Sequence, residues 1–406
     1  MRLRTSGITE VRGRNAVRVY GTGTKGAASN VHVCLVTPYP ATDDAVVGGV
    51  EAASLRLVTA LLERPDVRVT IVAPAAESRV EVRSGAQIHW VASRPAVLPG
   101  IVRYWTTERR ALLAVVHEVD ADVVHVQAIA GWGLGLRGPR IFQMHGVPEE
   151  AVLHTQRRTR RLSSLVHVVI ERRGRRSFPM VAVVGAHMVE RFGSQFSGDV
   201  LVAENTVPDS YFTIERTPTP GQILHGGVVS PRKNTLGLLR AFRQVLDEVP
   251  GATLRIAGDK TSFRAYVDEC TRFCAHAGIA HRVAFLGPIS IEQMRDELSK
   301  AEALVLPSFN ESAPVIICEA MAAGVPVVSS RRDGMVSMVE EGRTGFLIEP
   351  DDHVAIANAV VTLLTDTAGN HAMGVASRSA AAARFSSEVL ASTMLSCYDK
   401  LVESGQ

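Results

Sequence analysis

The 406-residue sequence contains no run of about 18 apolar residues, so no helix that spans a membrane is expected. Its first 30 residues also lack the apolar stretch of a signal peptide. Cysteine is scarce, because only five are scattered along the chain and none forms a C-x-x-C pair. A disulfide framework and a zinc site of that type are therefore excluded, and we predict a cytoplasmic location.

What the sequence does contain is 46% hydrophobic and 21% charged residues, which is an ordinary globular composition. A chain of 406 residues exceeds what one core usually serves, so two domains are expected. The net charge of +3 conceals an uneven distribution. Residues 1–30 carry six basic residues against one Glu, and residues 154–178 carry eight Arg against one Glu. The rest of the chain is mildly acidic.

Short apolar runs alternate with segments of helical periodicity from Val31 onward, which predicts βαβ units and parallel sheets of the α/β class. Such doubly wound sheets bind ligands beyond the carboxyl ends of their strands, here in a cleft between two domains. Strands are expected at 31–37, 67–73, 88–92, 123–126, 140–144, 181–184, 223–227, 253–257, 283–286, 303–306 and 325–329. Helices are expected at 50–63, 107–119, 150–175, 235–249, 261–277, 290–299, 314–323 and 352–364. The predicted organisation is a flexible basic tail (1–30), a Rossmann-like domain (31–210), a linker (211–221), a second Rossmann-like domain (222–384) and a terminal helix (385–406).

Residues 306–328 carry the strongest motif, in which strand, loop, proline, helix and strand follow one another. The loop brings Glu311 to the edge of the sheet, and Ser312 is expected to cap a helix that has Pro314 in its first turn. The free N–H groups of such a turn favour anions, phosphate included. Glu319 follows a little over one turn later, within reach of two ribose hydroxyls. Either Glu alone could be an ordinary helix carboxylate, but the pair in this setting favours a site.

A second motif reads Gly-Gly-Val-Val-Ser-Pro-Arg-Lys-Asn at residues 226–234, between a strand and an amphipathic helix. A flexible turn at Gly227 followed by Arg232 and Lys233 suits a diphosphate, because Arg offers a fork of donors and Lys a point charge. The alternative is a turn with two solvated cations.

Two smaller signals lie in the first half of the chain. Gly48 and Gly49 follow the first strand, and tandem glycines let the backbone approach a ligand closely, although they could also form a simple turn. His145 follows strand 140–144 and is therefore expected at the sheet edge. His125 is interpreted as a satisfied core residue.

These motifs resemble the retaining nucleotide-sugar glycosyltransferases of family 4, also called group 1. The signature of that family is Glu-x7-Glu leading into Glu-Ala-Met-Ala-x-Gly-x-Pro-Val-Val, which stands here as Glu311 and Glu319 followed by residues 320–328. The resemblance implies the GT-B fold, in which two doubly wound Rossmann-like domains face each other across a cleft. It also implies that the terminal helix at 385–406 crosses back to the first domain.

The resemblance implies roles for individual residues. Glu311 would approach the hydroxyls of the donor sugar, Glu319 would bind the ribose, and Lys233 with Arg232 would hold the diphosphate. His145 would face the donor sugar. The implied catalytic residues are Glu311, His145 and Lys233, and the implied donor-binding residues are Gly48, Gly49, Gly227, Arg232, Lys233, Ser312, Ala313, Pro314, Val315 and Glu319.

The implied function is transfer of a sugar from a nucleoside-diphosphate sugar to an acceptor hydroxyl with retention of anomeric configuration, without a metal or another cofactor. The acceptor would be a glycan, a lipid-linked molecule or a small molecule in polysaccharide or glycoconjugate biosynthesis. Two alternatives remain open. One is another enzyme of the same fold, either a sugar-nucleotide epimerase or a phosphorylase. The other is a non-catalytic nucleotide-sugar-binding protein, because Val228 and Ser337 replace an Arg and a Glu of the family.

The basic segment 154–178 predicts an amphipathic helix whose Arg residues surround Leu, Val and Ile. Such helices bind anionic membrane surfaces, which would place the protein at the inner face of the membrane. A solvated Arg face is the alternative. No nucleic-acid partner is expected, because the predicted helix at 150–175 has no Phe, Tyr or Trp for base stacking.

Overall fold

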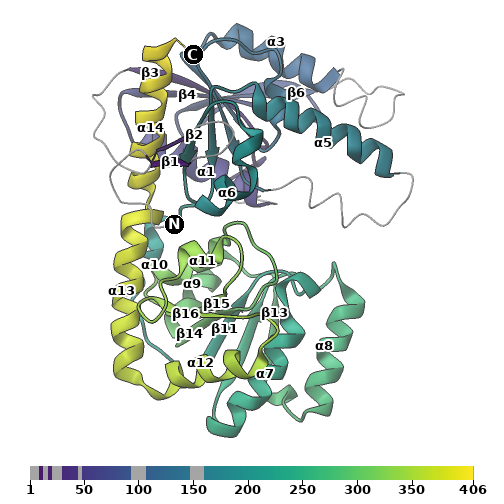
Figure 1. Cartoon of the computed structure of the whole chain (residues 1–406), viewed down its shortest axis with the longest axis vertical. Coiled ribbons are helices and arrows are strands. Elements are labelled where there is room, and N and C mark those ends of the chain that lie inside the picture. Colours follow the sequence, from purple (N-terminus) through teal and green to yellow (C-terminus); the bar gives the residue numbers. More distant parts are fainter. Residues whose placement is uncertain are drawn as a thin grey trace. The chain divides into compact units, whose positions relative to one another are not determined.

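The computed structural model describes residues 9–11, 17–20, 30–43, 48–92, 107–146 and 160–405. The chain forms two compact units, which we call unit 1 (Met1–Glu204 with Ser387–Gln406) and unit 2 (Asn205–Ser386). Figure 1 shows that each unit is a sheet with helices packed on its faces. The chain passes from one unit to the other twice, at Glu204–Asn205 and at Ser386–Ser387.

Unit 1 contains a sheet with the strand order β1-β2-β10-β9-β8-β7-β3-β4-β6-β5. The pairs β1–β2 and β5–β6 are antiparallel, and the other neighbours are parallel. The central strands are apolar and buried along their length, which is typical of parallel strands covered on both faces. The strands are β1 (Thr9–Val11), β2 (Val17–Tyr20), β3 (Val31–Val36), β4 (Val67–Ala75), β5 (Arg79–Arg83), β6 (Ala86–Ala92), β7 (Val123–Gln127), β8 (Arg140–Met144), β9 (Met180–Val183) and β10 (Asp199–Val202).

The helices of unit 1 cover this sheet. The last of them, α14, comes from the C-terminus and places Met394 and Tyr398 in the same buried core as β3 and β4. Figure 1 shows α14 in yellow alongside this sheet, and it also packs on α1. The elements are α1 (Gly49–Leu62), α3 (Arg109–Val119), α5 (Arg160–Arg176), α6 (Ala186–Phe192) and α14 (Ser387–Ser404), with short 3-10 turns η2 (Ala130–Gly133) and η3 (Gly193–Gln195).

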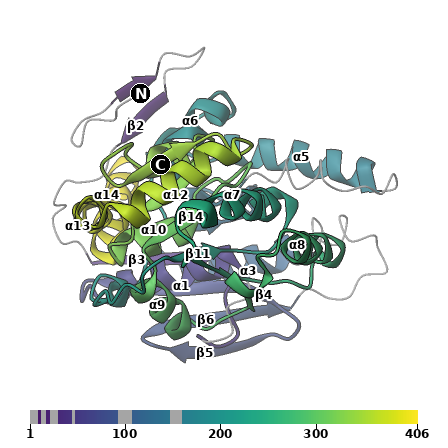
Figure 2. The ribbon, with the colours of Figure 1, turned by 90° about the horizontal axis from the view of Figure 1, so that it is seen from below.

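Unit 2 contains a parallel sheet with the order β13-β12-β11-β14-β15-β16. One face is covered by helices that include α7 and α12, which lie side by side in Figure 2. The strands are β11 (Gln222–Gly226), β12 (Thr253–Ala257), β13 (Val283–Gly287), β14 (Ala303–Leu306), β15 (Val327–Ser330) and β16 (Gly345–Ile348). The helices are α7 (Thr235–Glu248), α8 (Arg264–His276), α9 (Ile291–Lys300), α10 (Val315–Ala322), α11 (Met335–Met338), α12 (His353–Thr365) and α13 (Thr367–Phe385), with 3-10 turns η4 (Asp209–Tyr211), η5 (Pro231–Lys233) and η6 (Ala280–Arg282).

Each sheet is doubly wound, as predicted, because its strand order runs outward in both directions from a central pair. In unit 1 the order reverses between β3 and β7, and in unit 2 it reverses between β11 and β14. Loops that leave the carboxyl ends of such a central pair diverge to opposite faces and leave room for a ligand at the edge. We therefore expect the functional residues at these two switch points.

Three segments differ from the sequence-based expectation. The predicted tail contains strands, since β2 extends the sheet by pairing with β10. Residues 211–221, predicted as a linker, pack onto unit 2, where Tyr211 and Ile214 join a buried core. The terminal helix expected at 385–406 is α14, which begins at Ser387, because Ser386 is extended and separates it from α13. Within the described ranges, no helix combines the length and the apolarity needed to cross a membrane.

Candidate active site

The turn after β11 opens the candidate site in unit 2. Gly227 has a φ of +133°, and a Cβ atom added there would lie 2.7 Å from Cε of Lys233. A side chain is therefore excluded by both the backbone conformation and the neighbouring lysine. The 3-10 turn η5 follows, capped by the Ser230 side chain, and delivers Arg232 and Lys233 to the edge of the sheet.

Arg232 and Lys233 meet a single carboxylate. Oε1 of Glu311 lies 2.6 Å from Nζ of Lys233 and 2.7 Å from Nη1 of Arg232. The side chains of Lys233 and Glu311 are 9% and 11% exposed, whereas that of Arg232 is 49% exposed. Burial lowers the pKa of Lys233, and the nearby Glu311 carboxylate opposes that shift. The two motifs found in the sequence thus converge at the switch point between β11 and β14.

The loop that carries Glu311 is held at several points. The amide of Gly334 donates to the carbonyl of Glu311 at 3.1 Å, and the side chain of Asn310 donates to Asp333 at 2.9 Å. Asn205, the first residue of unit 2, donates from Nδ2 to the carbonyl of Ala313 at 2.8 Å. Glu311 therefore projects from a fixed backbone.

Helix α10 begins one residue later than the sequence suggested. Its N-cap is Pro314, with an extended ψ of 116°, and its first residue is Val315. Ser312 does not cap it, which corrects the prediction that Ser312 would cap a helix containing Pro314. Because Pro314 is extended, residues 311–313 are not part of the helix and follow the edge of the sheet. Val315 and Glu319 are half-buried on one face of α10, while the other six residues of the helix are apolar and buried.

His225 is a site residue that sequence reasoning missed. It lies in β11 just before the glycine turn, is fully buried, and its Nδ1 bonds to the carbonyl of Val305 at 2.8 Å. Burial lowers the pKa of His225 to about 4, with a further lowering by Lys233 and an opposing effect of Glu311. The imidazole is therefore neutral at physiological pH. A polar residue within the apolar run of β11 was the available signal.

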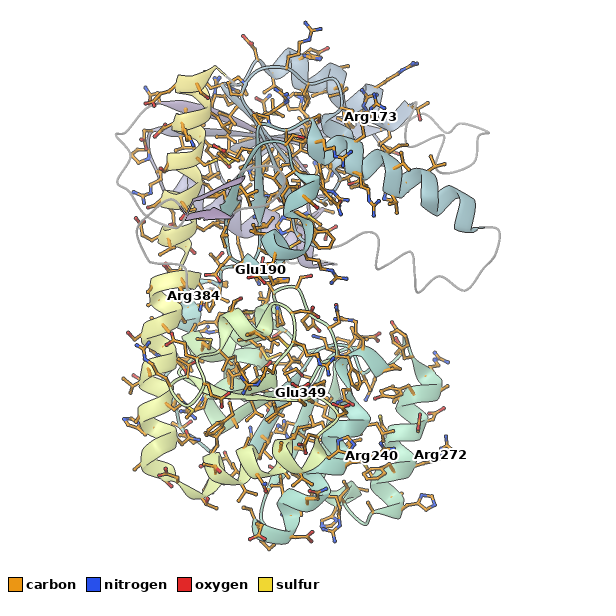
Figure 3. The ribbon with its side chains drawn as sticks, viewed as in Figure 1. Arg173, Glu190, Arg240, Arg272, Glu349 and Arg384 are labelled. Atoms are coloured by element: carbon orange, nitrogen blue, oxygen red, sulfur yellow. The ribbon has the colours of Figure 1, made fainter. Side chains whose placement is uncertain are left out.

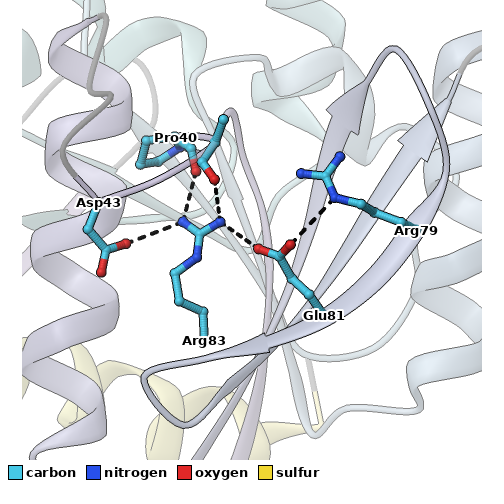
Figure 4. Close-up of polar contacts among 6 residues, drawn as sticks. Pro40, Asp43, Arg79, Glu81 and Arg83 are labelled. Atoms are coloured by element: carbon cyan, nitrogen blue, oxygen red, sulfur yellow. Dashed lines mark hydrogen bonds and ion pairs between the residues drawn. The ribbon is translucent and has the colours of Figure 1, made fainter.

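In unit 1 the corresponding loop follows β3. Arg83 holds this loop, because its guanidinium donates to the carbonyls of Pro40 at 3.0 Å and Ala41 at 2.6 Å, and pairs with Asp43 and Glu81 (Figure 4). Gly48 and Gly49 then start α1, and both are exposed. A Cβ atom at either glycine would meet nothing within 4 Å in the part of the chain that the structure describes.

Neutral polar side chains lie beneath this edge of unit 1. Oε1 of Gln127 accepts from the hydroxyls of Ser54 at 2.6 Å and Thr37 at 3.2 Å, and its Nε2 donates to Gln143 at 2.8 Å. All four residues are buried. The network joins α1 to the carboxyl ends of β3, β7 and β8.

Two histidines adjoin this network. His125 is fully buried and its Nδ1 bonds to the hydroxyl of Tyr398 on α14 at 2.7 Å, as expected of a core histidine. His145 follows β8 and is half-buried, and its Nε2 has no hydrogen-bond partner among the described residues. Burial lowers the pKa of His125 to about 3 and that of His145 to about 4, so both rings are neutral near pH 7.

The basic helix α5 buries two charged side chains near its C-terminal end. Glu171 and Arg175 are each 1% exposed, and the Glu171 carboxylate accepts from the amide of Ala130 at 2.9 Å. Val166 and Val169 are instead 44% and 63% exposed. Arg173, labelled in Figure 3, is also exposed on α5. Residues 150–159 of the helix expected at 150–175 lie outside the described residues.

Two family sequence models match the chain. "Glycosyltransferase Family 4" matches residues 47–208, and "Glycosyl transferases group 1" matches residues 220–366, so together they cover roughly three quarters of the sequence. The chain belongs to the family 4, group 1 glycosyltransferases. The boundary between the two matched regions lies close to the division between unit 1 and unit 2.

Curated and structural relatives agree with this membership of the glycosyltransferase family. A "D-inositol 3-phosphate glycosyltransferase" of Corynebacterium diphtheriae is 36% identical over 141 residues, which is 34% of this chain and 33% of that protein. The alignment thus spans about a third of the length of that relative. A solved "Sucrose-phosphate synthase" from Thermosynechococcus elongatus has a TM-score of 0.74 at 20% identity and covers 92% of this chain and 100% of its own.

A further solved structure is an Anabaena protein, Alr3699/HepE, "in complex with UDP and glucose". It has a TM-score of 0.68 at 18% identity and covers 92% of this chain and 99% of its own. These likenesses show the fold, and this glycosyltransferase family member has the GT-B fold that the sequence predicted.

The predicted residues therefore fall into two groups. In unit 2 the structure brings Gly227, Arg232, Lys233 and Glu311 together, with the start of α10 following the Glu311 loop. In unit 1, Gly48, Gly49 and His145 follow β3 and β8 of the same sheet. Across the described ranges, no three His, Cys, Asp or Glu side chains gather as metal ligands would.

Proposed function

We propose that this protein transfers a glycosyl group from a nucleoside-diphosphate sugar to an acceptor hydroxyl, with retention of anomeric configuration and without a metal. The observation that carries the proposal is the cluster of Arg232, Lys233 and Glu311 at the switch point of unit 2. Two cations at the end of a central strand suit a diphosphate, and a carboxylate beside them suits sugar hydroxyls. The UDP and glucose bound by the Anabaena relative support this choice of ligand.

Charge explains how such a site would promote the reaction. The bond between the anomeric carbon and the diphosphate oxygen breaks, and negative charge grows on the leaving phosphate. Lys233 and Arg232 stabilise that charge, which lowers the barrier without a covalent intermediate. The acceptor oxygen bonds to the anomeric carbon on the same face, and its proton passes to the departing diphosphate. Glu319 is assigned to the ribose, and His145 with Gly48 and Gly49 to the sugar and phosphates.

A thermal-shift screen of nucleoside-diphosphate sugars tests the proposal. A preferred donor at about 100 times its Kd stabilises the folded protein by about 2.7 kcal/mol and so raises the melting temperature. Incubation of that donor with glycan, lipid-linked and small-molecule acceptors should then yield a product whose anomeric configuration, read by NMR, matches the donor. The transfer should persist in EDTA. If no donor shifts the melting temperature, the proposed function is wrong.

The same assay separates the alternatives. An epimerase would convert or cleave the sugar nucleotide with no acceptor present, and a binding protein would be stabilised by the donor without consuming it. Product formation that depends on an acceptor contradicts both alternatives.

The exposed face of α5 favours a second, compatible activity, which is attachment to an anionic membrane surface. Val166 and Val169 are exposed about two turns and one turn before the exposed Arg173, and apolar groups beside cations bind at a lipid interface. Flotation with vesicles rich in phosphatidylglycerol tests this, with pure phosphatidylcholine vesicles as the control. Val169→Asp combined with Arg173→Glu should abolish flotation. Flotation equal in both lipids, or in neither, would remove the membrane from the account.

A further inference from the structure

The ion cluster in unit 2 holds two cations against one carboxylate. Lys233 and Arg232 both contact the same oxygen, Oε1 of Glu311, at 2.6 Å and 2.7 Å. In the part of the chain that the structure describes, no other carboxylate forms an ion pair with either cation. Glu311 thus occupies the position that an anionic ligand of these cations would need.

The two cations lie at different depths. Lys233 is 9% exposed and Arg232 is 49% exposed, so Arg232 can pair with an anion in solution while Glu311 stays on Lys233. Separating Glu311 from Lys233 without a replacement would leave a buried ammonium unpaired, which is costly. A ligand that displaces Glu311 must therefore bring negative charge to both depths at once. Two linked phosphates bring more negative charge to the two cations than a single phosphate does, so they compete with Glu311 more strongly.

The contacts around Glu311 hold its backbone in place and allow its side chain to move. The carbonyl of Glu311 is fixed by Gly334, Arg232 donates to the carbonyl of Asn310 at 2.8 Å, and the amide of Phe309 donates to the carbonyl of Arg232 at 2.9 Å. Because the two loops are tied together, Glu311 can leave the cations by rotation of its side chain while the backbone stays in place. His225, whose pKa responds to both Lys233 and Glu311, is neutral and offers no substitute charge.

We infer that Glu311 is a specificity-determining residue that acts as an internal counter-ion: it competes with the ligand for Lys233 and Arg232, and a diphosphate displaces it more readily than a monophosphate. The inference rests on the proposed function, since it assumes that the cluster binds a nucleoside diphosphate. When the diphosphate takes over both cations, the released carboxylate becomes an acceptor next to the group that the diphosphate carries. Binding of the diphosphate thus precedes contact of Glu311 with the sugar.

Isothermal titration with UDP, GDP and ADP, and with the monophosphate of whichever base binds, tests this inference. Glu311→Gln keeps the shape of the side chain and removes its charge, so the diphosphate should bind about tenfold more tightly than to the wild type. The affinity for the monophosphate should change by less than about threefold. Glu311→Ala serves as a second variant with the same expected direction. The matched control is Glu349→Gln, which breaks an ion pair with Arg332 at the surface and should leave both affinities unchanged.

The outcomes separate the inference from the proposed function. Tighter diphosphate binding in both Glu311 variants, together with lost sugar transfer, supports the inference. A merely structural role of Glu311 would instead lower both the diphosphate affinity and the rate of sugar transfer. If the Glu311 variants bind the diphosphate with the same affinity as the wild type or more weakly, the inference is wrong and the proposed function is unaffected. An equal gain for monophosphate and diphosphate overturns it as well. If none of the nucleoside diphosphates binds to the wild type or to the variants, the proposed function fails and the inference fails with it.

Discussion

The carboxyl edge of the unit 2 sheet holds two cations and a carboxylate in contact, whereas that of unit 1 holds neutral amides, hydroxyls and imidazoles. In unit 2, Lys233 and Glu311 are charged and largely buried. In unit 1, Gln127 and Gln143 are bonded to each other, and His145 is kept neutral by burial. The same doubly wound architecture thus carries an edge suited to anions and another suited to hydroxyl groups. Four experiments test this contrast between the two edges.

The largest effect is expected from removing charge in unit 2. Lys233→Ala should lower the rate of sugar transfer about a hundredfold to a thousandfold, because a buried donor to the leaving group is lost. Lys233→Arg should retain part of the rate. Lys300→Ala, which removes an exposed lysine paired with Asp296, is the control and should be without effect. Transfer by Lys233→Ala within threefold of the wild type would show that the charged edge is not used.

The glycines of the two edges should respond differently to a methyl group. Gly227→Ala places a Cβ 2.7 Å from Lys233 at a φ of +133°, so we expect a loss of about 1–3 kcal/mol in the free energy of unfolding. Gly48 has an extended backbone and none of the described residues lies within 4 Å of its Cβ position, so Gly48→Ala should change stability by less than about 0.5 kcal/mol. Urea denaturation measures both. Equal losses would mean that the two glycine turns are under the same constraint.

Stability should fall as the pH is lowered below neutrality, and more steeply in unit 1. The pKa of His125 is lowered to about 3 and those of His145 and His225 to about 4, whereas the unfolded chain takes up these protons near 6.5. Between pH 6.5 and 4 the unfolded state therefore binds more protons, which costs about 1.4 kcal/mol per pH unit for each proton of difference.

Hydrogen exchange at pH 7 and pH 5 can follow the two units separately. Unit 1 contains two of these three histidines and should lose more protection than unit 2. His145→Gln should flatten the pH dependence of unit 1, and His225→Gln that of unit 2. A wild-type stability that is constant down to pH 5 would contradict neutral burial of these rings.

The smallest effect is expected at His145. If the neutral ring contributes only a hydrogen bond to the donor, His145→Ala should lower kcat/KM about tenfold. His145→Gln, which restores a neutral donor and acceptor, should recover most of that loss. If kcat/KM falls as far in His145→Gln as in His145→Ala, and the activity of the wild type requires a protonated group, then the ring of His145 does not act in its neutral form.

The central strands and the unit 2 site could be predicted because local and long-range signals agree there. The strand at 140–144 and the strand at 303–306 were placed to the residue, since their apolar runs are buried on both faces. Glu311 and Lys233 were identified because glycine and proline mark the turns on which they lie. Their mutual contact follows from the neighbouring positions of β11 and β14, which a motif alone does not encode.

Other features depend on tertiary contacts that leave no local signal. β5 is an edge strand in which Val80 and Val82 are exposed and Arg83 faces a loop, so its apolar residues do not mark a core. The burial of Arg175 and the exposure of Val169 reverse the polarity that the composition of α5 suggests, because Glu171 caps η2 from the same helix. The role of His225 likewise depends on a partner in another strand, the carbonyl of Val305.

The two crossings of the chain between the units bear on how the protein is made. Unit 2 is one uninterrupted stretch, Asn205–Ser386, whereas the core of unit 1 includes Leu390, Met394, Tyr398 and Leu401. During synthesis the residues of unit 2 have all left the ribosome before Tyr398 is available to bond to His125. Domains that form while the chain grows usually complete from the N-terminus onward. Here unit 1 is begun before unit 2 and completed after it, so the core of unit 1 stays open in a nascent chain until α14 has been translated.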